Sequence, residues 1–220
     1  MPFYLTPTTI ALIIVFMLLL LTAMPASRVL RHKFFLRRRF VLLEIPANFF
    51  ESHKAKDLLE NLPVPFVFEV AVHHLGKDKH FYLSVPKTHV AQVIAQTGAE
   101  EADDYNIYHS GGSHLGFYLK SVNLISLDLA SIDFSRINVV GEGAVIQLIV
   151  KYGGQSRASA NFRILVSAPT PYQAQEVALG LNSSMSDSRP VTVSKNLQVF
   201  IHRLTYREFD EEEAVGWSNA

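Results

Sequence analysis

The first 27 residues contain no charged side chain, and the 12 residues that follow contain six basic side chains and no acidic one. The run from Ile10 to Met24 is apolar apart from one threonine, and uncharged residues flank it on both sides. A helix rises about 1.5 Å per residue, so about 20 apolar residues cross the hydrocarbon core of a bilayer. The sequence therefore predicts that residues 5–26 span a membrane once, within an anchor formed by residues 1–27.

The basic stretch, residues 28–39, predicts the orientation of this anchor. Lysine and arginine next to a span keep that flank in the cytoplasm, so we expect the N-terminus outside and the remaining chain inside, at the inner membrane. The same stretch forms a tether whose basic side chains would contact anionic lipid headgroups: Arg28, Arg31, Lys33, Arg37, Arg38 and Arg39. A role in nucleic-acid binding is the less favoured interpretation of this cluster.

Two other interpretations of the apolar run fit less well. Small residues such as Ala23 and Ala26 would permit a cleavable signal peptide, but the leading MPFYLTPTT lacks the basic region with which such peptides begin. A buried core helix of this length normally shows a polar face, and this run has none.

The composition of the whole chain narrows the function. With 20 basic and 20 acidic residues the formal net charge is zero, so there is no global basic field and no nucleic-acid partner is expected. Outside the basic stretch the balance is 14 basic against 20 acidic residues, a net charge of −6. The absence of cysteine excludes disulfides, iron–sulfur clusters, cysteine-ligated zinc and thiol catalysis.

Residues 40–109 show strand and helix patterns in the order strand, helix, strand, strand, helix, strand. Alternating apolar residues indicate strands, and apolar residues at spacings of three and four indicate helices, with Gly98 as a helix C-terminal cap. This order is that of a ferredoxin-like unit. The expected strands are residues 40–46, 65–75, 80–86 and 103–109, and the expected helices are residues 52–62 and 87–98.

After a short linker at residues 110–113, residues 114–207 repeat the same order. Thr170 is the expected N-cap of the second helix, and Pro171 its first residue. We therefore predict an α+β fold in which a transmembrane helix precedes two tandem ferredoxin-like (βαββαβ) units. The expected strands here are residues 116–125, 144–153, 160–169 and 197–206, and the expected helices are residues 128–137 and 170–185.

Residues 208–220 form an acidic tail in which Glu208 and the run Asp210–Glu213 supply five carboxylates. We expect a solvated, poorly ordered end, with a docking peptide as the alternative.

Motifs for catalysis or cofactor binding are missing, so we assign no catalytic, cofactor-binding or metal-binding residue. There is no GxxxxGK[ST], GxSxG or HExxH sequence, and Ser126 with Asp128 has no base placed beside it. The glycine pairs at 111–112 and 153–154 and the GEG sequence at 141–143 indicate turns. An RNA-recognition module is disfavoured because its basic and glycine residues are missing around HFYLSVP.

A metal site on the expected hairpin is also disfavoured. Adjacent residues of a strand point to opposite faces, so His73 and His74 cannot both bind one ion without a bulge. His74 and His80 lie near the turn, but the spacing fixes no acidic third ligand. The acidic pairs Glu100–Glu101 and Asp103–Asp104 are expected to be solvated.

Five segments together resemble an uncharacterised family of membrane-anchored proteins of candidate-phyla bacteria. They are FVFEVAV, HFYLSVP, DDY at Asp103–Tyr105, GEGAVIQLIV and NFRILVSAPTPYQAQEVALGL, and the resemblance covers Phe40 to Tyr206. In that family this region precedes, or is encoded beside, a conjugation-type ATPase of type IV secretion systems. The longer relatives carry the ATPase after this region, so we expect any motor activity of the system to lie in another polypeptide.

The resemblance and the anchor together suggest a non-enzymatic scaffold. We expect the protein to dock a type IV secretion or conjugation-type P-loop ATPase, or its partner subunits, at the cytoplasmic face of the membrane, without a cofactor. The alternative is a membrane-tethered sensor or enzyme that holds a small molecule between the two units, in a pocket lined by His73, His80 or Arg163 with converging carboxylates. A regulatory domain of a transporter is a third possibility.

Overall fold

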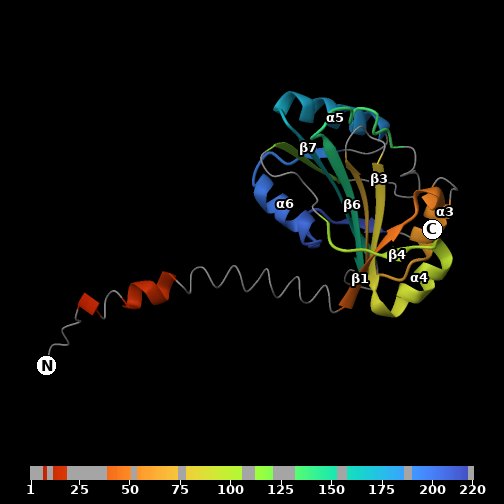
Figure 1. The fold of residues 1–220 in the computed structure, drawn as a ribbon, viewed down its shortest axis with the longest axis horizontal. Coiled ribbons are helices and arrows are strands. Elements are labelled where there is room, and N and C mark those ends of the chain that lie inside the picture. Colours follow the sequence, from red (N-terminus) through yellow and green to blue (C-terminus); the bar gives the residue numbers. More distant parts are fainter. Residues whose placement is uncertain are drawn as a thin grey trace. The chain divides into compact units, whose positions relative to one another are not determined.

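The computed structural model describes residues 7–8, 12–18, 39–50, 54–73, 78–105, 112–120, 132–152, 158–185 and 190–217. The chain divides into two units, Met1–Arg39 and Phe40–Ala220, and the second is called the body below. Figure 1 shows the path of the chain.

In the first unit, residues 7–8 and 12–18 are helical. Within the described residues, no helix combines the length and the hydropathy that crossing a membrane requires. Most of the expected span at residues 5–26, and the basic residues from Arg28 to Arg38, lie outside the described residues; Arg39 is described and exposed.

The body is an α+β structure built on one antiparallel sheet of nine strands. The strands are β1 (Phe40–Ile45), β2 (Phe66–His73), β3 (Asp78–Pro86), β4 (Glu100–Glu101), β5 (Ser113–Leu119), β6 (Gly143–Tyr152), β7 (Ala158–Ala168), β8 (Pro190–Thr192) and β9 (Val215–Trp217). The helices described in the body are α2 (Ala47–Phe50), α3 (Lys54–Asn61), η1 (Lys87–His89), α4 (Val90–Thr97), α5 (Pro171–Ser184) and α6 (Leu197–Thr205).

The strand order across the sheet is β4-β1-β3-β2-β6-β7-β5-β8, and β9 pairs with β7. Read inward from each edge, both halves have the same order: the fourth strand, then the first, the third and the second. The halves meet where β2 pairs with β6 in antiparallel register, from Phe66 opposite Val150 to His73 opposite Gly143. The two halves therefore join edge to edge in one continuous sheet.

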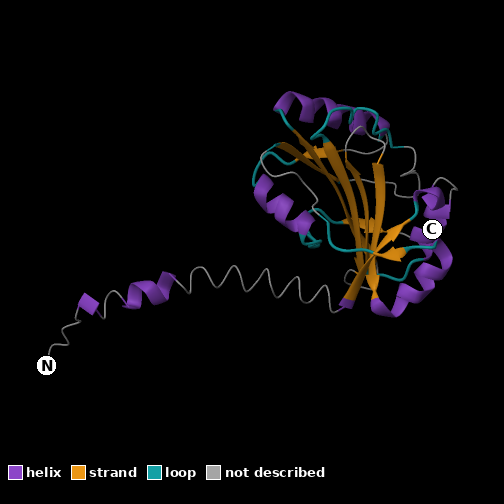
Figure 2. Cartoon of the chain, viewed as in Figure 1, coloured by secondary structure: helices purple, strands orange, loops and turns teal. Residues whose placement is uncertain are grey.

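Alternation along the strands gives the sheet two different faces. One face carries the main apolar core, which includes Leu43, Val70 and Phe162 and is covered by α3, α4 and α5. The opposite face carries a smaller apolar cluster around Val145 and Leu165, covered by Phe200, Ile201 and Leu204 of α6. Figure 2 shows α6 on one side of the strands and α3 and α4 on the other.

The helix ends confirm two local predictions. Thr170 caps α5 by accepting a hydrogen bond from the backbone N–H of Gln173, and Pro171 is the first residue of the helix. Gly98 ends α4 with a φ of 71°, and its N–H donates to the carbonyl of Ile94. Only glycine adopts this left-handed conformation without a steric penalty, which explains why the helix ends there.

Two predictions about the second half are wrong. Residues 197–206 were expected to form a strand, but Leu197–Thr205 is helix α6, because its apolar residues recur at helical spacing. The fourth strand of this half is the short β8 instead. The expected helix at 128–137 is not helical in its described part, residues 132–137, where only residues 135–136 form a turn, yet Ile132, Phe134 and Ile137 still enter the main core.

The expected strand at residues 103–109 is also displaced. The strand that pairs with β1 is β4, Glu100–Glu101, and residues 103–105 follow it without strand structure. Tyr105 instead stacks on Tyr82 of β3, with ring centroids 4.2 Å apart. Residues 106–109 lie outside the described residues.

Candidate functional site

A row of polar side chains crosses the sheet on the face that α6 covers. Each residue of the row pairs with the next in the strand register, and directly opposed residues of antiparallel strands project from the same face. In order from β1 to β5, the polar row consists of Glu44, Tyr82, Glu69, Gln147, Arg163 and Tyr118.

Glu69 is the acidic centre of the polar row and is almost fully buried, with 1% exposure. Its carboxylate accepts hydrogen bonds from Gln147 Nε2 at 2.7 Å and from the Tyr105 hydroxyl at 3.0 Å. Arg207, which follows α6, donates to the same carboxylate through Nε at 3.1 Å and Nη2 at 2.9 Å. A buried carboxylate needs such partners, because an unpaired charge in the interior is costly.

Arg163 is the basic centre of the polar row and has no exposed surface. Its Nε donates to Glu213 Oε2 at 2.6 Å, and its Nη1 donates to the carbonyl of Glu208, also at 2.6 Å. Longer hydrogen bonds at 3.3–3.4 Å reach Asn161 and Gln147. Partners from β6, from β7 itself and from residues 208–213 therefore satisfy this guanidinium.

The C-terminal segment, residues 206–217, supplies three of these partners, Arg207, Glu208 and Glu213. Asn161 Nδ2 donates to the carbonyl of Asp210, and the N–H of Asp210 donates to Asn161 Oδ1. The Asp210 carboxylate pairs with Arg203 of α6. The expectation of a solvated tail is therefore wrong for Asp210 and Glu213, which are buried.

The segment ends in β9, which places Val215 and Trp217 against the main core. Trp217 meets Phe66 edge-on, with ring centroids 6.0 Å apart. The end of the chain thus covers the polar row and also extends the apolar core.

Burial and charge shift several pKa values in this network. Burial alone would lower the pKa of Arg207, but the carboxylates of Glu69 and Asp104 outweigh it and raise that pKa. Burial, reinforced by the charge of Glu69, raises the pKa of Tyr105 well above its usual value. Burial lowers the pKa of Arg163, while the Glu213 carboxylate opposes this effect. Tyr105 therefore stays a neutral hydrogen-bond donor at physiological pH.

The histidines singled out in the sequence lie at one end of the first half. His80 Nδ1 is 2.8 Å from Glu44 Oε1, and the rings of His73 and His80 are 6.5 Å apart. Among the described residues, no group of three histidine or acidic side chains is arranged to hold a metal ion. His74, like Ser126 and Asp128, lies outside the described residues.

All four residues of the acidic pairs are exposed, as expected, and Glu100 and Glu101 form β4. The exposed carboxylate of Asp104 also accepts a hydrogen bond from Arg207 Nη1 at 3.1 Å.

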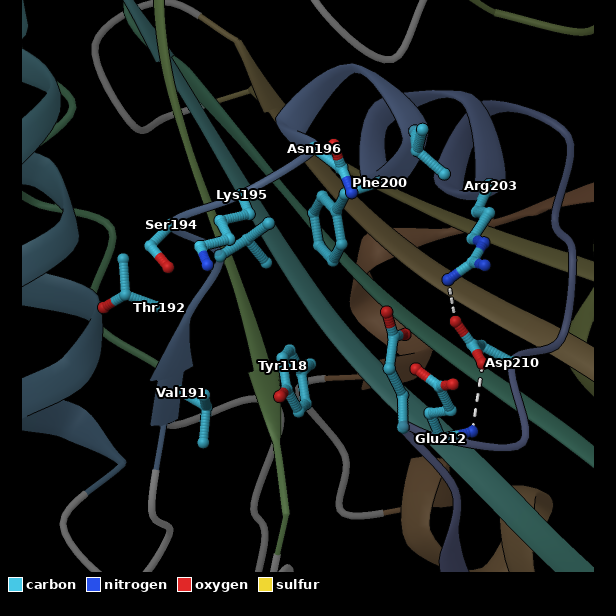
Figure 3. A pocket seen from close by; sticks show the side chains of 13 residues that line it. Tyr118, Val191, Thr192, Ser194, Lys195, Asn196, Phe200, Arg203, Asp210 and Glu212 are labelled. Carbon is cyan, nitrogen blue, oxygen red and sulfur yellow. Dashed lines mark hydrogen bonds and ion pairs between the residues drawn. The ribbon is translucent and has the colours of Figure 1, made fainter.

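A cavity of about 400 Å³ opens beside the second half, where the polar row ends at Tyr118. Residues 191–196, three residues of α6 and three acidic residues of the C-terminal segment complete its lining, as Figure 3 shows. Arg163, His73 and His80, the residues that the alternative sensor or enzyme function would place around a ligand, are not among the lining residues.

Sequence reasoning did not identify the polar row, although a signal for it exists. Each of its three central residues is a single polar residue within an apolar strand: Glu69 in FVFEVAV, Gln147 in AVIQLIV and Arg163 in FRILV. A charged residue on such a strand needs a buried partner. The register that joins these three residues could not be read from the sequence.

The chain matches no protein-family model and no curated protein.

Proposed function

We propose that the protein is a non-catalytic, single-pass membrane scaffold. Residues 5–26 anchor it, and its body docks a P-loop ATPase of type IV secretion or conjugation type, or partner subunits of that motor, at the cytoplasmic face. In this proposal the body consists of two tandem ferredoxin-like units. The strand order of each half and the antiparallel pairing throughout support this assignment.

The exposure of residues 12–18 supports the membrane anchor. Every side chain from Leu12 to Leu18 is large and apolar, and each is between 46% and 69% exposed. Insertion into lipid would shield such a continuous apolar surface from water at low cost. The basic tether of residues 28–39 would then lie at the headgroups on the cytoplasmic side.

An exposed apolar surface on α5 and the loop before β6 carries the docking proposal. Four large apolar side chains contribute to it: Val139 and Val140 of the loop, and Tyr172 and Leu179 of α5, which are 41%, 71%, 71% and 64% exposed. Clustered exposed apolar side chains are a common feature of protein-binding surfaces.

Contacts between the loop and α5 unite these side chains into one surface. Arg136 Nη1 lies 3.8 Å from Glu176 Oε2, and the Arg136 side chain packs over Gly180. At the other end, Gly141 lies against Pro169, just before α5 begins. Tyr172, Glu176 and Leu179 recur at helical spacing, so they share one face of α5 beside this loop.

The polar row supports a non-catalytic role for its charges. Glu69 is paired with Arg207, and Arg163 is paired with Glu213, both from the C-terminal segment. A group that is enclosed and fully paired stabilises the fold and is poorly placed to exchange protons with a substrate.

Co-purification tests the docking proposal. The full chain, expressed at native level and extracted in detergent, should retain a P-loop ATPase, and Leu179→Glu should reduce the recovery of that ATPase at least several-fold. Tyr152→Glu is the matched control, because Tyr152 is equally exposed and lies at the far end of β6 from the loop. A clean monomer without a partner, or equal recovery with both variants, would contradict the proposal.

Reporter fusions test the anchor separately. A reporter that is active only in the periplasm should stay silent behind Ala220 and become active at the N-terminus. Mature protein that begins near Ser27 would show instead that the apolar run is a signal peptide.

A further inference from the structure

The cavity beside the second half lies at the end of the polar row, where the C-terminal segment no longer covers it. The C-terminal segment encloses Arg163, but the next residue of the row, Tyr118, is only half-buried and lines the cavity. Val191 and Val199 line it as well, together with Phe200 of α6. The cavity therefore offers apolar and aromatic surface at the end of a charged row.

The charges that line the cavity fall into paired and unpaired groups. Arg203 pairs with Asp210, and Glu213 pairs with the buried Arg163. Lys195 and Glu212 also line the cavity, and within the described part of the chain neither the Lys195 ammonium nor the Glu212 carboxylate has a partner. One positive and one negative charge are thus left available to a ligand.

These two charges come from different walls. Lys195 and Ser194 belong to the connection between β8 and α6, and Thr192 ends β8, whereas Glu212 belongs to the C-terminal segment. Figure 3 shows Lys195 and Ser194 on one side, Glu212 and Asp210 on the other, and the rings of Tyr118 and Phe200 between them. This separation suits a ligand with opposite charges at its two ends.

We propose that this cavity binds a small zwitterion that carries its two charges at opposite ends of an apolar or aromatic body, such as a dipeptide. Its ammonium group lies at the Glu212 carboxylate, and its carboxylate lies at the Lys195 ammonium, within reach of the hydroxyls of Thr192 and Ser194. The body packs on Tyr118 and Phe200. A volume of about 400 Å³ is in the range of small-molecule sites. This inference does not depend on the docking function.

Calorimetry on the full chain in detergent tests the proposal with three dipeptides and their analogues. The dipeptides are glycyl-phenylalanine, phenylalanyl-glycine and glycyl-leucine. The C-terminal amide of each dipeptide lacks the carboxylate, and the N-acetyl form lacks the ammonium group. We expect at least one of the three zwitterions to bind saturably, and its amide and N-acetyl forms to bind at least about fivefold more weakly, because each analogue forfeits one ion pair at a partly exposed site.

Two variants assign the charges. Glu212→Gln and Lys195→Gln should each weaken the zwitterion about fivefold, while Glu101→Gln and Lys87→Gln, exposed positions outside the cavity, should leave binding unchanged. Glu212→Gln keeps the hydrogen bond from the backbone N–H of residue 212 to the Asp210 carboxylate, so the segment should stay in place.

Three results would overturn the proposal. The first is no saturable binding of any of the three zwitterions at up to about 10 mM, a concentration that reveals a millimolar Kd. The second is an N-acetylated or amidated analogue that binds as tightly as the parent zwitterion. The third is a variant pair in which only one charge matters, which would indicate a site for a simple cation or anion.

Discussion

The two faces of the sheet are stabilised in different ways. The face under α3, α4 and α5 is filled by apolar side chains, whose burial is favourable in any orientation that excludes water. The opposite face carries the polar row, and each charge in it needs a partner at hydrogen-bond distance. One face therefore depends on how completely apolar side chains fill it, whereas the other requires the C-terminal segment in one particular position.

Adjacent residues of β7 allow a direct comparison of these two kinds of stabilisation. Phe162 and Arg163 both have no exposed surface, and they point to opposite faces of the sheet. Variants at these two positions separate the contribution of each face to stability. Variants at Gly116 and Glu211, where smaller effects are expected, extend the comparison.

The largest effect is expected on the apolar face. Phe162→Ala leaves a cavity in the main core, and it should lower the free energy of unfolding by about 4 kcal/mol. Urea unfolding followed by circular dichroism measures this change. A loss below about 1 kcal/mol would show that the apolar face is loosely packed around β7.

The next effect is expected on the polar face. Arg163→Met leaves the Glu213 carboxylate buried without its partner, and it should cost about 3 kcal/mol in the same measurement. The double variant Arg163→Met with Glu213→Met removes both charges, so it should be at least as stable as Arg163→Met alone. Additive losses would mean that the two side chains do not act as a pair.

A smaller effect is expected where α6 rests on β5. A Cβ atom on Gly116 would lie 2.8 Å from the Phe200 ring and 3.1 Å from Leu197. Gly116→Ala should therefore push α6 away from the sheet and cost about 2 kcal/mol. Hydrogen exchange of the α6 amides should accelerate more than that of the α5 amides, and equal changes in both helices would refute a local effect.

The smallest effect is expected at an exposed ion pair that the C-terminal segment makes with β6. Lys151 Nζ lies 2.5 Å from Glu211 Oε1, but the Glu211 side chain is 76% exposed. Glu211→Gln should change the free energy of unfolding by about 0.5 kcal/mol or less. Comparison with Glu213→Gln, two residues further along, isolates the effect of burial. If both variants lost the same free energy of unfolding, burial would not distinguish the ion pair of Glu213 from that of Glu211.

The first half and α5 were largely predictable because their signals are local. The strands around Phe68 and Leu83 alternate, Gly98 ends α4, and Thr170 with Pro171 begins α5. Helix α6 was missed although Leu197, Phe200, Ile201 and Leu204 recur at helical spacing, because the β-prone residues in LQVFIHRLTY suggested a strand.

The candidate site was much less predictable. The C-terminal segment is rich in glutamate and was expected to be solvated, since a run of carboxylates is usually on the surface. Its burial depends on Arg163 and Asn161 of β7, which lie about fifty residues away in the sequence. Composition could not reveal that these particular side chains would meet the segment.

The sequence by itself determined which residues alternate, where α4 ends and where α5 begins, because spacing and capping act over a few residues. Only the tertiary structure decided that β2 pairs with β6 and that the C-terminal segment closes the polar face. The hydrogen bonds between Arg207 and Glu69 join residues 138 positions apart. Such a contact depends on how the whole sheet assembles, so no local pattern encodes it.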